Sequence, residues 1–244
     1  MDGTVPSLAL TELGPKRAYF GAEPVAIGLE LASGPAVDVV LSARSRAGRG
    51  LEVWREEIGD LGADGQAARV IWNGMTKRGR PARDGRYAMV ATVAGIEEKL
   101  GVVSMHGHFF PVRGPHRPRG WLGEFGAPRS GGRRHLGFDV NASCGTPIAS
   151  VRAGRVLARG YDPNLYGNYV RIAGAHERRS YFYAHMSKPA RPALGTRVAT
   201  GEVLGRVGLT GNAAGTPCHL HFEMRVKGRT VDPARHLRAW DRHS

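Results

Sequence analysis

The 244-residue sequence lacks several features that assign a protein to a familiar class. No apolar run reaches the length of about 18 residues needed to cross a bilayer, so no transmembrane segment is predicted. Residues 1–6 contain neither the basic region nor the apolar core of a signal peptide. The sequence therefore predicts a cytoplasmic protein, or one from which an export signal or membrane anchor has been left off.

Motifs for nucleic-acid binding are also missing, although the net charge is +14. Residues 1–100 contain 13 Lys/Arg and 13 Asp/Glu, whereas residues 101–244 contain 22 and 8, so the second part of the chain supplies all of the excess charge. Such a surface predicts an anionic partner. Without a helix-turn-helix, zinc-finger or RNA-binding signature, an anionic cell-wall polymer is favoured over nucleic acid.

Helical periodicity is scarce, whereas short strand-like patterns are common. The composition, 41% hydrophobic and 23% charged, is that of a globular protein with one large domain or two of moderate size. Gly- and charge-rich turns separate four strand-like segments within residues 1–103, namely residues 25–31, 37–42, 68–72 and 86–93. Repeated short strands at this spacing predict a β-sandwich.

The first half also carries a short family resemblance. Trp-Asn-Gly at residues 72–74, a Gly/Arg-rich loop and Asp-Gly-Arg-Tyr at residues 84–87 resemble the Ig-like module of flagellar hook-capping proteins and other bacterial surface proteins. The resemblance implies an Ig-like fold and no activity. Residues 1–103 are therefore predicted to position the rest of the chain or to bind a protein partner, with a structural spacer as the alternative.

A second domain is predicted after a linker. Residues 104–134 are rich in glycine, proline and arginine and have almost no periodic pattern, which indicates a linker and the entry to the next domain. Its histidines, His106, His108 and His116, are predicted to be exposed, with a role as extra metal ligands as the alternative. Strands and glycine turns alternate again over residues 135–238. The expected fold class is therefore mostly β, with an Ig-like β-sandwich followed by an antiparallel sheet domain.

Two segments of this second domain combine polar and apolar residues in a strand-like alternation. Within residues 218–224, His219, His221 and Glu223 fall on one face of a strand and the apolar residues on the other. In residues 134–140, a histidine, a glycine and an aspartate are predicted to share one face, opposite Leu136, Phe138 and Val140. Each segment therefore presents metal-binding side chains to one side.

These side chains suit a zinc centre. Catalytic zinc sites use three protein ligands and keep a further position open for water. His135 and Asp139, with Gly137 between them leaving room for an ion, would form such a set together with either His219 or His221. For the His-x-His pattern alone, two ordinary histidines on a half-exposed strand are the alternative.

The two cysteines, Cys144 and Cys218, flank the predicted centre. If the centre forms, they come close enough to pair, and such a disulfide would imply an oxidising compartment. Two buried free thiols, or two thiolate ligands of the metal, are the alternatives. Because a bond between these residues would close a long loop, it would add roughly 4 kcal/mol of stability.

The order of six short blocks identifies a family. The second half resembles the M23 family of zinc metallopeptidases, specifically the lysostaphin/LytM-type catalytic domain that cleaves peptide bonds of peptidoglycan. The likeness runs from about residue 109 to residue 233. Its blocks are His-Leu-Gly-Phe-Asp at 135–139, Cys-Gly-Thr-Pro-Ile at 144–148, Gly-Asn-Tyr-Val-Arg-Ile at 167–172, Tyr-Ala-His-Met at 183–186, Gly-Leu-Thr-Gly-Asn at 208–212 and His-Leu-His-Phe-Glu at 219–223.

Site residues follow from the resemblance position by position. It implies that His135, Asp139 and His221 bind Zn²⁺, and that His185 and His219 are the catalytic histidines. The choice between His219 and His221 therefore comes from the family. His185 lies on an aromatic strand, where the local sequence alone indicates a packed core residue.

The implied chemistry suits peptide hydrolysis. Zinc lowers the pKa of its water and polarises the scissile carbonyl, while a histidine relays the proton to the leaving amine. Tyr183, Asn168 and Asn212 are weaker candidates for lining the cleft, with roles in turns and packing as the alternative.

The sequence leaves three functional hypotheses. The resemblance implies a zinc endopeptidase acting on peptidoglycan outside the cytoplasm, at the cell wall or secreted. A catalytically silent or autoinhibited M23-like domain that binds cell wall and regulates another hydrolase is the second hypothesis, because the Gly/Arg-rich segment before His135 could cover the cleft. A basic binding protein with incidental histidines is the third, which the spacing disfavours.

Overall fold

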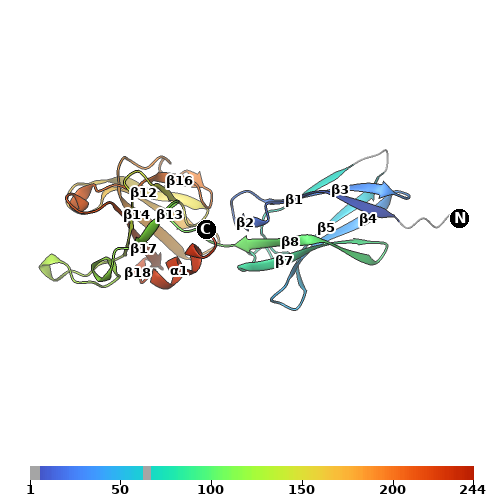
Figure 1. Ribbon diagram of the computed structural model, residues 1–244, viewed down its shortest axis with the longest axis horizontal. Helices are drawn as coiled ribbons and strands as arrows, with labels where there is room; N and C mark the ends of the chain where they lie inside the picture. The colour runs from blue at the N-terminus through green and yellow to red at the C-terminus, as the bar shows by residue number, and fades with distance from the viewer. Residues whose placement is uncertain (1–5, 63–66) are drawn as a thin grey trace. The chain divides into compact units, whose positions relative to one another are not determined.

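A computed structural model describes residues 6–62 and 67–244 and divides the chain into two compact units. The first unit ends at Gly107 and the second begins at His108 (Figure 1). Both are built from strands, and the described residues contain a single α-helix, α1 (Ala234–Asp241). The fold is therefore mostly β, as predicted.

Two sheets form the N-terminal unit. A three-stranded sheet has the order β1-β3-β6, and a five-stranded sheet has the order β2-β8-β7-β4-β5. The strands are β1 (Ser7–Gly14), β2 (Arg17–Tyr19), β3 (Val25–Ser33), β4 (Val37–Ser45), β5 (Leu51–Leu61), β6 (Ala68–Trp72), β7 (Gly85–Val93) and β8 (Ile96–His106). One apolar core joins the sheets, with Ile27 and Trp72 from the first and Leu41 and Met89 from the second. This is a β-sandwich arrangement; its Ig-like character stays a prediction.

Sequence periodicity predicted some of these strands and missed others. The four predicted segments all lie within strands β3, β4, β6 and β7. The charged segment that became β5 was predicted to be a turn between two strands, and that prediction is wrong; β8 lies after the last predicted segment and was not identified. Most residues of β5 are exposed, at the edge of its sheet, so the strand lacks the buried alternation that periodicity detects.

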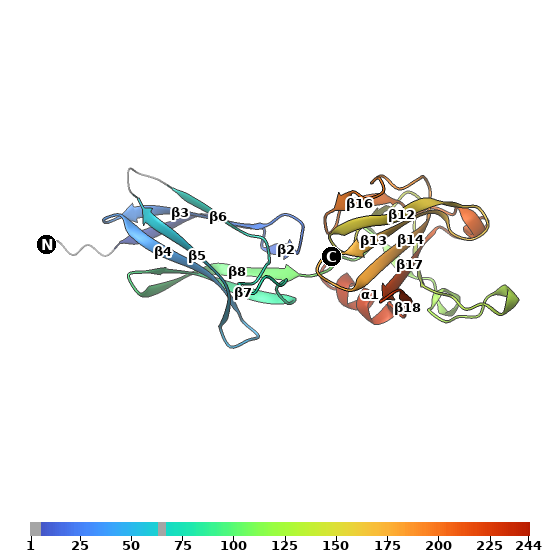
Figure 2. The same ribbon diagram turned by 180° about the vertical axis from the view of Figure 1, so that it is seen from behind.

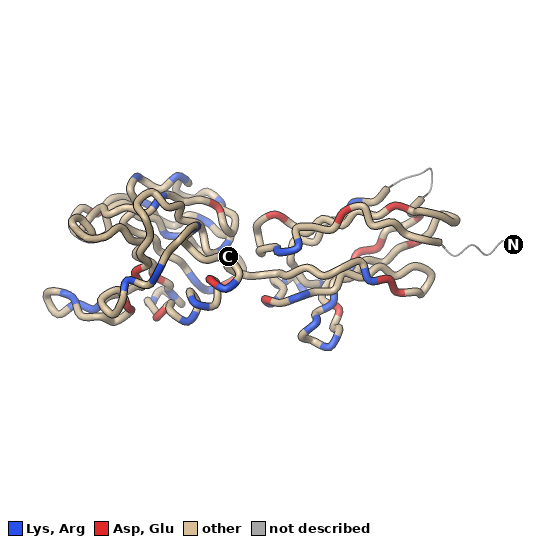
Figure 3. Tube along the Cα trace, in the orientation of Figure 1, with Lys and Arg blue, Asp and Glu red and all other residues tan. Residues whose placement is uncertain are grey.

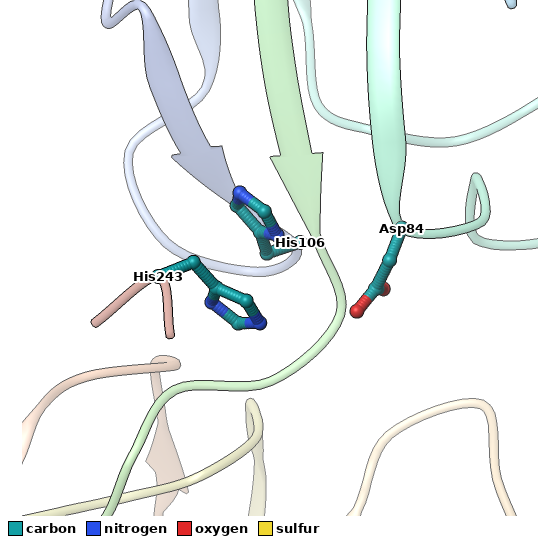
Figure 4. A group of neighbouring side chains, drawn as sticks. All are labelled: Asp84, His106 and His243. Carbon is teal, nitrogen blue, oxygen red and sulfur yellow. The ribbon is translucent and has the colours of Figure 1, made fainter. Parts of the chain in front are cut away.

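The end of β8 is tied to the start of β7. Asp84 Oδ1 accepts a hydrogen bond of 2.7 Å from the amide nitrogen of Gly107. The carboxylate of Asp84 and the imidazole of His106 extend from the neighbouring ends of these two strands (Figure 4). Here His106 is half-buried, not exposed as predicted.

An eight-stranded antiparallel sheet forms the C-terminal unit, seen from behind in Figure 2. Its order is β15-β12-β13-β14-β17-β10-β9, with β18 also paired to β17. The strands are β9 (His116–Pro118), β10 (Phe138–Ala142), β12 (Gly154–Asp162), β13 (Gly167–Gly174), β14 (Arg179–Met186), β15 (Arg197–Val198), β17 (His219–Val226) and β18 (Arg229–Val231), while β11 (Pro147–Ala149) and β16 (Val203–Arg206) form a separate pair. This agrees with the antiparallel sheet predicted.

One face of the sheet packs on a large apolar core. Phe138 of β10, Tyr181 and Tyr183 of β14, and Phe222 of β17 lie in it together with Trp240 of α1. The opposite face of the same strands is free for polar side chains. A disulfide between Cys144 and Cys218 links the segment after β10 to the start of β17, with the Cα atoms 5.3 Å apart.

Residues 104–134 divide between the two units. The segment through Gly107 belongs to the first unit, and the segment from His108 to the second, where it includes β9 and the 3-10 turns η2 (Trp121–Gly123) and η3 (Ser130–Gly132). The exposure predicted for two histidines here is wrong: His108 stacks on Trp240 at 4.8 Å and His116 on Phe110 at 4.2 Å. No helix in the described parts of the chain combines the length and apolarity needed to span a membrane.

Candidate metal centre

The register of β10 with β17 builds most of the site. Asp139 pairs with His221, and Asn141 pairs with His219. The apolar residues of both strands point into the core, so the carboxylate and the imidazoles are placed on the opposite face. The predicted alternation is thus confirmed for β17 and for the part of the first segment that is a strand.

His135 reaches the site from a loop. The strand begins only at Phe138, so residues 135–137 do not alternate as predicted, and Leu136 is exposed instead of sharing the buried face of Phe138. Gly137 passes so close to β17 that a Cβ atom there would lie 2.5 Å from the Phe222 carbonyl oxygen and 2.7 Å from Cε1 of His221. A glycine is therefore needed for His135 to approach His221.

Three ligand atoms converge at the centre of the site. His135 Nε2 lies 3.1 Å from Asp139 Oδ1, His221 Nδ1 lies 3.0 Å from the same oxygen, and the two nitrogens are 2.9 Å apart. All three residues are buried. The set contains two imidazole nitrogens and a carboxylate oxygen, which is a donor set that zinc binds in proteins.

Hydrogen bonds on the far side of each imidazole fix which nitrogen is free. His135 Nδ1–H donates to the carbonyl oxygen of Glu124 at 2.8 Å, and His221 Nε2–H donates to Glu223 Oε1 at 3.3 Å. Because these partners are acceptors, the neutral rings keep their lone pairs on the two converging nitrogens. Three lone-pair atoms then face one another, and a bound cation would stabilise them. The residues present therefore fit a zinc ion.

The electrostatics agree with a site made to hold positive charge. Burial would raise the pKa of Asp139, but hydrogen bonds from His135 and His221 hold it well below its usual range. Burial lowers the pKa of His221, yet the hydrogen bonds to Asp139 and Glu223 outweigh it and raise that pKa to about 9. In the absence of a metal, the site would therefore take up a proton in its place.

A bulge at the end of β14 brings His185 to the same place. Tyr181 and Tyr183 point into the core, and strict alternation would bury His185 beside them. The register with β13 shifts here, and His185 adopts a positive φ of 60°. The next residue, Met186, enters the core instead. The centroid of the His185 ring lies 4.9 Å from that of the His219 ring and 5.8 Å from that of the His221 ring.

Both of these histidines are held neutral with one nitrogen facing the site. His185 Nδ1–H donates to the Thr210 carbonyl, and His219 Nδ1–H donates to the Pro217 carbonyl, each at 2.9 Å. Burial, aided by the nearby His221 and His219, lowers the pKa of His185 to about 3, and burial also lowers the pKa of His219. His219 Nε2 lies 3.9 Å from Asp139 Oδ2, outside the converging set.

A pocket of about 630 Å³ opens over these residues. Asn212 lines it, together with all five of the predicted metal and catalytic residues. The other two predicted cleft residues lie elsewhere: the Tyr183 hydroxyl accepts a hydrogen bond from the Val151 amide in the core, and Asn168 Nδ2 donates to the Met186 carbonyl. Their contacts are structural.

A family comparison agrees with this geometry. Residues 133–233 match the model of peptidase family M23. The chain carries an M23 peptidase domain. The family match covers His135, Asp139, His185, His219 and His221, and begins after the N-terminal unit has ended.

Two relatives of the M23 domain are peptidases by name. The chain is 34% identical over 177 residues to the L-Ala-D-Glu endopeptidase of Bacillus subtilis (strain 168), a match covering 64% of this chain and 53% of that protein. It is 40% identical over 101 residues to the DD-carboxypeptidase/endopeptidase Mpg of Neisseria meningitidis serogroup B, covering 41% of this chain and 22% of that protein. The matches thus span about half or less of these relatives.

A solved structure is also similar to the M23 domain. The catalytic domain of lysostaphin from Staphylococcus simulans is 27% identical and covers 47% of this chain and 89% of that chain, with a TM-score of 0.43.

Sequence reasoning missed several residues around the M23 site. Glu223 was placed on the correct face but given no role; it is fully buried and bonded to His221, Tyr166 and Arg225. The His-x-His-x-Glu alternation was the signal that could have identified it. Arg119 contacts the His219 ring from the loop after β9, where no periodic pattern reveals it.

Proposed function

We propose that the chain is a zinc metalloendopeptidase that hydrolyses peptide bonds of bacterial peptidoglycan. The observation that carries the proposal is the convergence of His135 Nε2, His221 Nδ1 and Asp139 Oδ1, three possible metal-binding atoms on buried side chains. The M23 domain and the endopeptidase names of its relatives support the reaction class.

His135, Asp139 and His221 would hold the zinc. When bound, zinc supplies Lewis acidity toward the scissile carbonyl and lowers the pKa of the attacking water. Glu124 and Glu223 orient the two imidazoles through their other nitrogens. Arg225 and Tyr166 in turn hold the Glu223 carboxylate, donating at 2.7 and 3.2 Å.

His185 and His219 would act as the general base and general acid of the hydrolysis. Each keeps its Nδ1 proton on a backbone carbonyl, so each Nε2 is a neutral acceptor within the pocket. A neutral imidazole takes a proton from the attacking water and returns it to the leaving amine. The lowered pKa of both rings keeps them neutral at physiological pH, ready to accept.

An autoinhibited form of the same enzyme is the second candidate, and one contact favours it. Arg119 Nη1 lies 2.9 Å from His219 Nε2, the atom assigned to proton transfer. The same guanidinium nitrogen also contacts Nδ1 of this ring, so Arg119 lies against the imidazole, and substrate would have to displace it to reach Nε2. If the contact is inhibitory, Arg119→Ala will raise turnover of soluble wall fragments; if it positions His219 for the reaction, the same change will lower turnover.

The substrate implies a place outside the cytoplasm, and the Cys144–Cys218 disulfide is consistent with an oxidising compartment. The N-terminal unit contains none of the proposed site residues, and we assign it a role in binding a protein partner or positioning the peptidase.

The deciding experiment combines metal analysis with product analysis. Zinc content per chain is measured on purified protein, and peptides released from purified cell walls are identified by mass spectrometry. One zinc per chain with new peptide termini supports the enzyme and identifies the bond. Zinc without released peptides overturns the catalytic assignment in favour of a regulatory domain, and no zinc overturns the metal site.

A further inference from the structure

Arginine is concentrated around one pocket of the C-terminal unit. Four arginines line the pocket above the candidate metal centre: Arg119, Arg129, Arg133 and Arg134. All belong to the segment between β9 and β10, which Figure 3 shows carrying several basic residues. Of the described residues that line this pocket, Asp139 alone is acidic.

The partners of these arginines are backbone carbonyls and a neutral ring. Arg133 Nε donates to the Ser130 carbonyl at 3.3 Å, and Arg134 Nη1 donates to the Gly126 carbonyl at 3.1 Å. Arg119 contacts the His219 imidazole. In residues 6–62 and 67–244, none of these three arginines lies within 4.0 Å of a carboxylate or forms an ion pair.

Arg129, the fourth arginine of the pocket, differs from the other three because it lies near a carboxylate. Its Nη2 donates to the Leu122 carbonyl at 2.8 Å and lies 3.8 Å from Asp139 Oδ2. That carboxylate is committed to His135 and His221, so it is a weak counter-ion for the guanidinium.

Uncompensated guanidinium groups beside a reaction centre favour an anionic ligand. Arginine presents its N–H groups in a planar fork that matches a carboxylate with two parallel hydrogen bonds. The pocket also has apolar side chains, including Leu122 and Leu136, both exposed. Its lining is therefore suited to a short alkyl side chain next to a carboxylate.

We propose that the arginines of this pocket, Arg133 and Arg134 foremost, select peptides with a free carboxylate next to the scissile bond over peptides in which that group is neutral. The inference rests on the proposed function for its substrate and names the substrate class: acidic stem peptides, in preference to uncharged glycine bridges. Because the arginines and the metal centre line the same pocket, the recognised carboxylate lies close to the bond that is cut.

The test uses stem peptides in which the carboxylates are converted one at a time to carboxamides. Dissociation constants are measured by calorimetry on the full chain loaded with zinc and carrying His185→Ala, which lowers turnover by about 100- to 10,000-fold. We expect one carboxamide peptide to bind about tenfold more weakly than its acid, the effect of one charge-assisted hydrogen bond. Equal binding of every amide and its acid overturns the proposal.

A matched pair of variants separates local recognition from net charge. Adding Arg133→Ala and Arg134→Ala should bring the acid-to-amide ratio close to one, whereas Arg197→Ala with Arg229→Ala, two exposed arginines outside the pocket, should leave it unchanged. An identical change in both double variants assigns the effect to net charge and overturns the proposal. Zinc content confirms that each variant is folded.

A salt titration gives a second test that needs no further substitution. The tenfold ratio should shrink steadily as ionic strength rises, because the pocket is open to solvent and its charges are screened. A ratio that does not change with salt contradicts recognition by charge. Since binding is measured separately from turnover, the failure of this inference is distinguishable from the failure of the hydrolase assignment, which the wild-type chain reports through released peptides.

Discussion

The two units share one kind of secondary structure and differ in what they bury. Of the eleven buried polar or charged residues in the described parts of the chain, only Ser42 belongs to the N-terminal unit, and the other ten belong to the C-terminal unit. Burying a polar group costs free energy unless hydrogen bonds or a bound ion compensate for it. The second unit therefore gives up stability at its site, and the first does not.

Charge follows the same division. In the N-terminal unit, 13 basic and 13 acidic residues balance, and pairs such as Arg44–Glu97 and Arg69–Glu12 lie on the surface. In the C-terminal unit the basic residues outnumber the acidic ones, and carboxylates such as Asp139 and Glu223 are buried against histidines. These two carboxylates are thus paired with histidines in the site. The arginines of the pocket therefore have few carboxylates to pair with, which favours binding of an anionic ligand.

Of the changes considered, removal of a metal ligand should have the largest effect, and it should affect only the C-terminal unit. His135→Ala or Asp139→Ala should abolish both zinc binding and hydrolysis, because each removes one of three converging atoms. His185→Ala should keep zinc and lower kcat by about 100- to 10,000-fold, the usual contribution of a general base. Elemental analysis and turnover of wall fragments measure the two effects. His236→Ala is the control, since it lies outside the pocket.

The metal assignment fails if both ligand variants retain zinc at the wild-type level. The role of His185 fails if its alanine variant keeps full turnover.

The disulfide should account for the next largest effect, and only in the C-terminal unit. Replacing Cys144 and Cys218 together by serine should destabilise that unit by about 4 kcal/mol, because the bond closes a loop of 74 residues in the unfolded chain. Scanning calorimetry should show one transition moving and the other unchanged. Two thiols titrated in denatured, unreduced wild-type protein would contradict the pairing.

In the metal-free protein, lowering the pH should change the stability of the C-terminal unit more than that of the N-terminal unit. The folded unit keeps His185 neutral down to a pKa of about 3, whereas an unfolded histidine titrates near 6.5, so the unfolded state binds more protons between these values. The stability of the C-terminal unit should therefore fall as pH decreases from about 6.5 toward 3. His221 acts in the opposite sense: its raised pKa of about 9 adds stability below 6.5, which is lost as pH rises toward 9.

These two effects predict a stability maximum near neutral pH for the C-terminal unit without metal. Among the described residues, the N-terminal core contains no ionisable side chain except Tyr87, so that unit should show no such maximum. Thermal unfolding in the presence of a chelator, followed from pH 4 to 9, measures both transitions. Parallel pH profiles of the two units would contradict the assignment of buried, coupled histidines to one of them.

Periodicity predicted the parts of the site that lie on regular strands. His219, His221 and Asp139 follow from alternation alone, because β10 and β17 pair without interruption. The choice of His221 over His219 depends on register, which sets Asp139 opposite His221 and which no single strand encodes. That choice came from the family resemblance.

The remaining site residues depend on irregular backbone. Alternation predicts that His185 is buried with Tyr183, and only the bulge with its positive φ turns the ring to the other face. Arg119 and Arg129 lie in a segment with no repeating pattern, so their approach to the site is set by tertiary contacts. Local pattern therefore determined the strands and their faces, while long-range packing determined the rest.

The smallest expected difference compares one ion pair from each unit. Arg225 donates to Glu223, whose side chain is fully buried, so Arg225→Ala leaves a buried carboxylate short of a partner and should cost about 2 kcal/mol. Arg44 pairs with an exposed Glu97, where water replaces the lost partner, so Arg44→Ala should leave the unfolding free energy of its unit unchanged within error. Urea unfolding of the two variants measures both. Equal losses would mean that burial does not distinguish the two units, because the same substitution would then cost as much at a solvated surface as beside the metal centre.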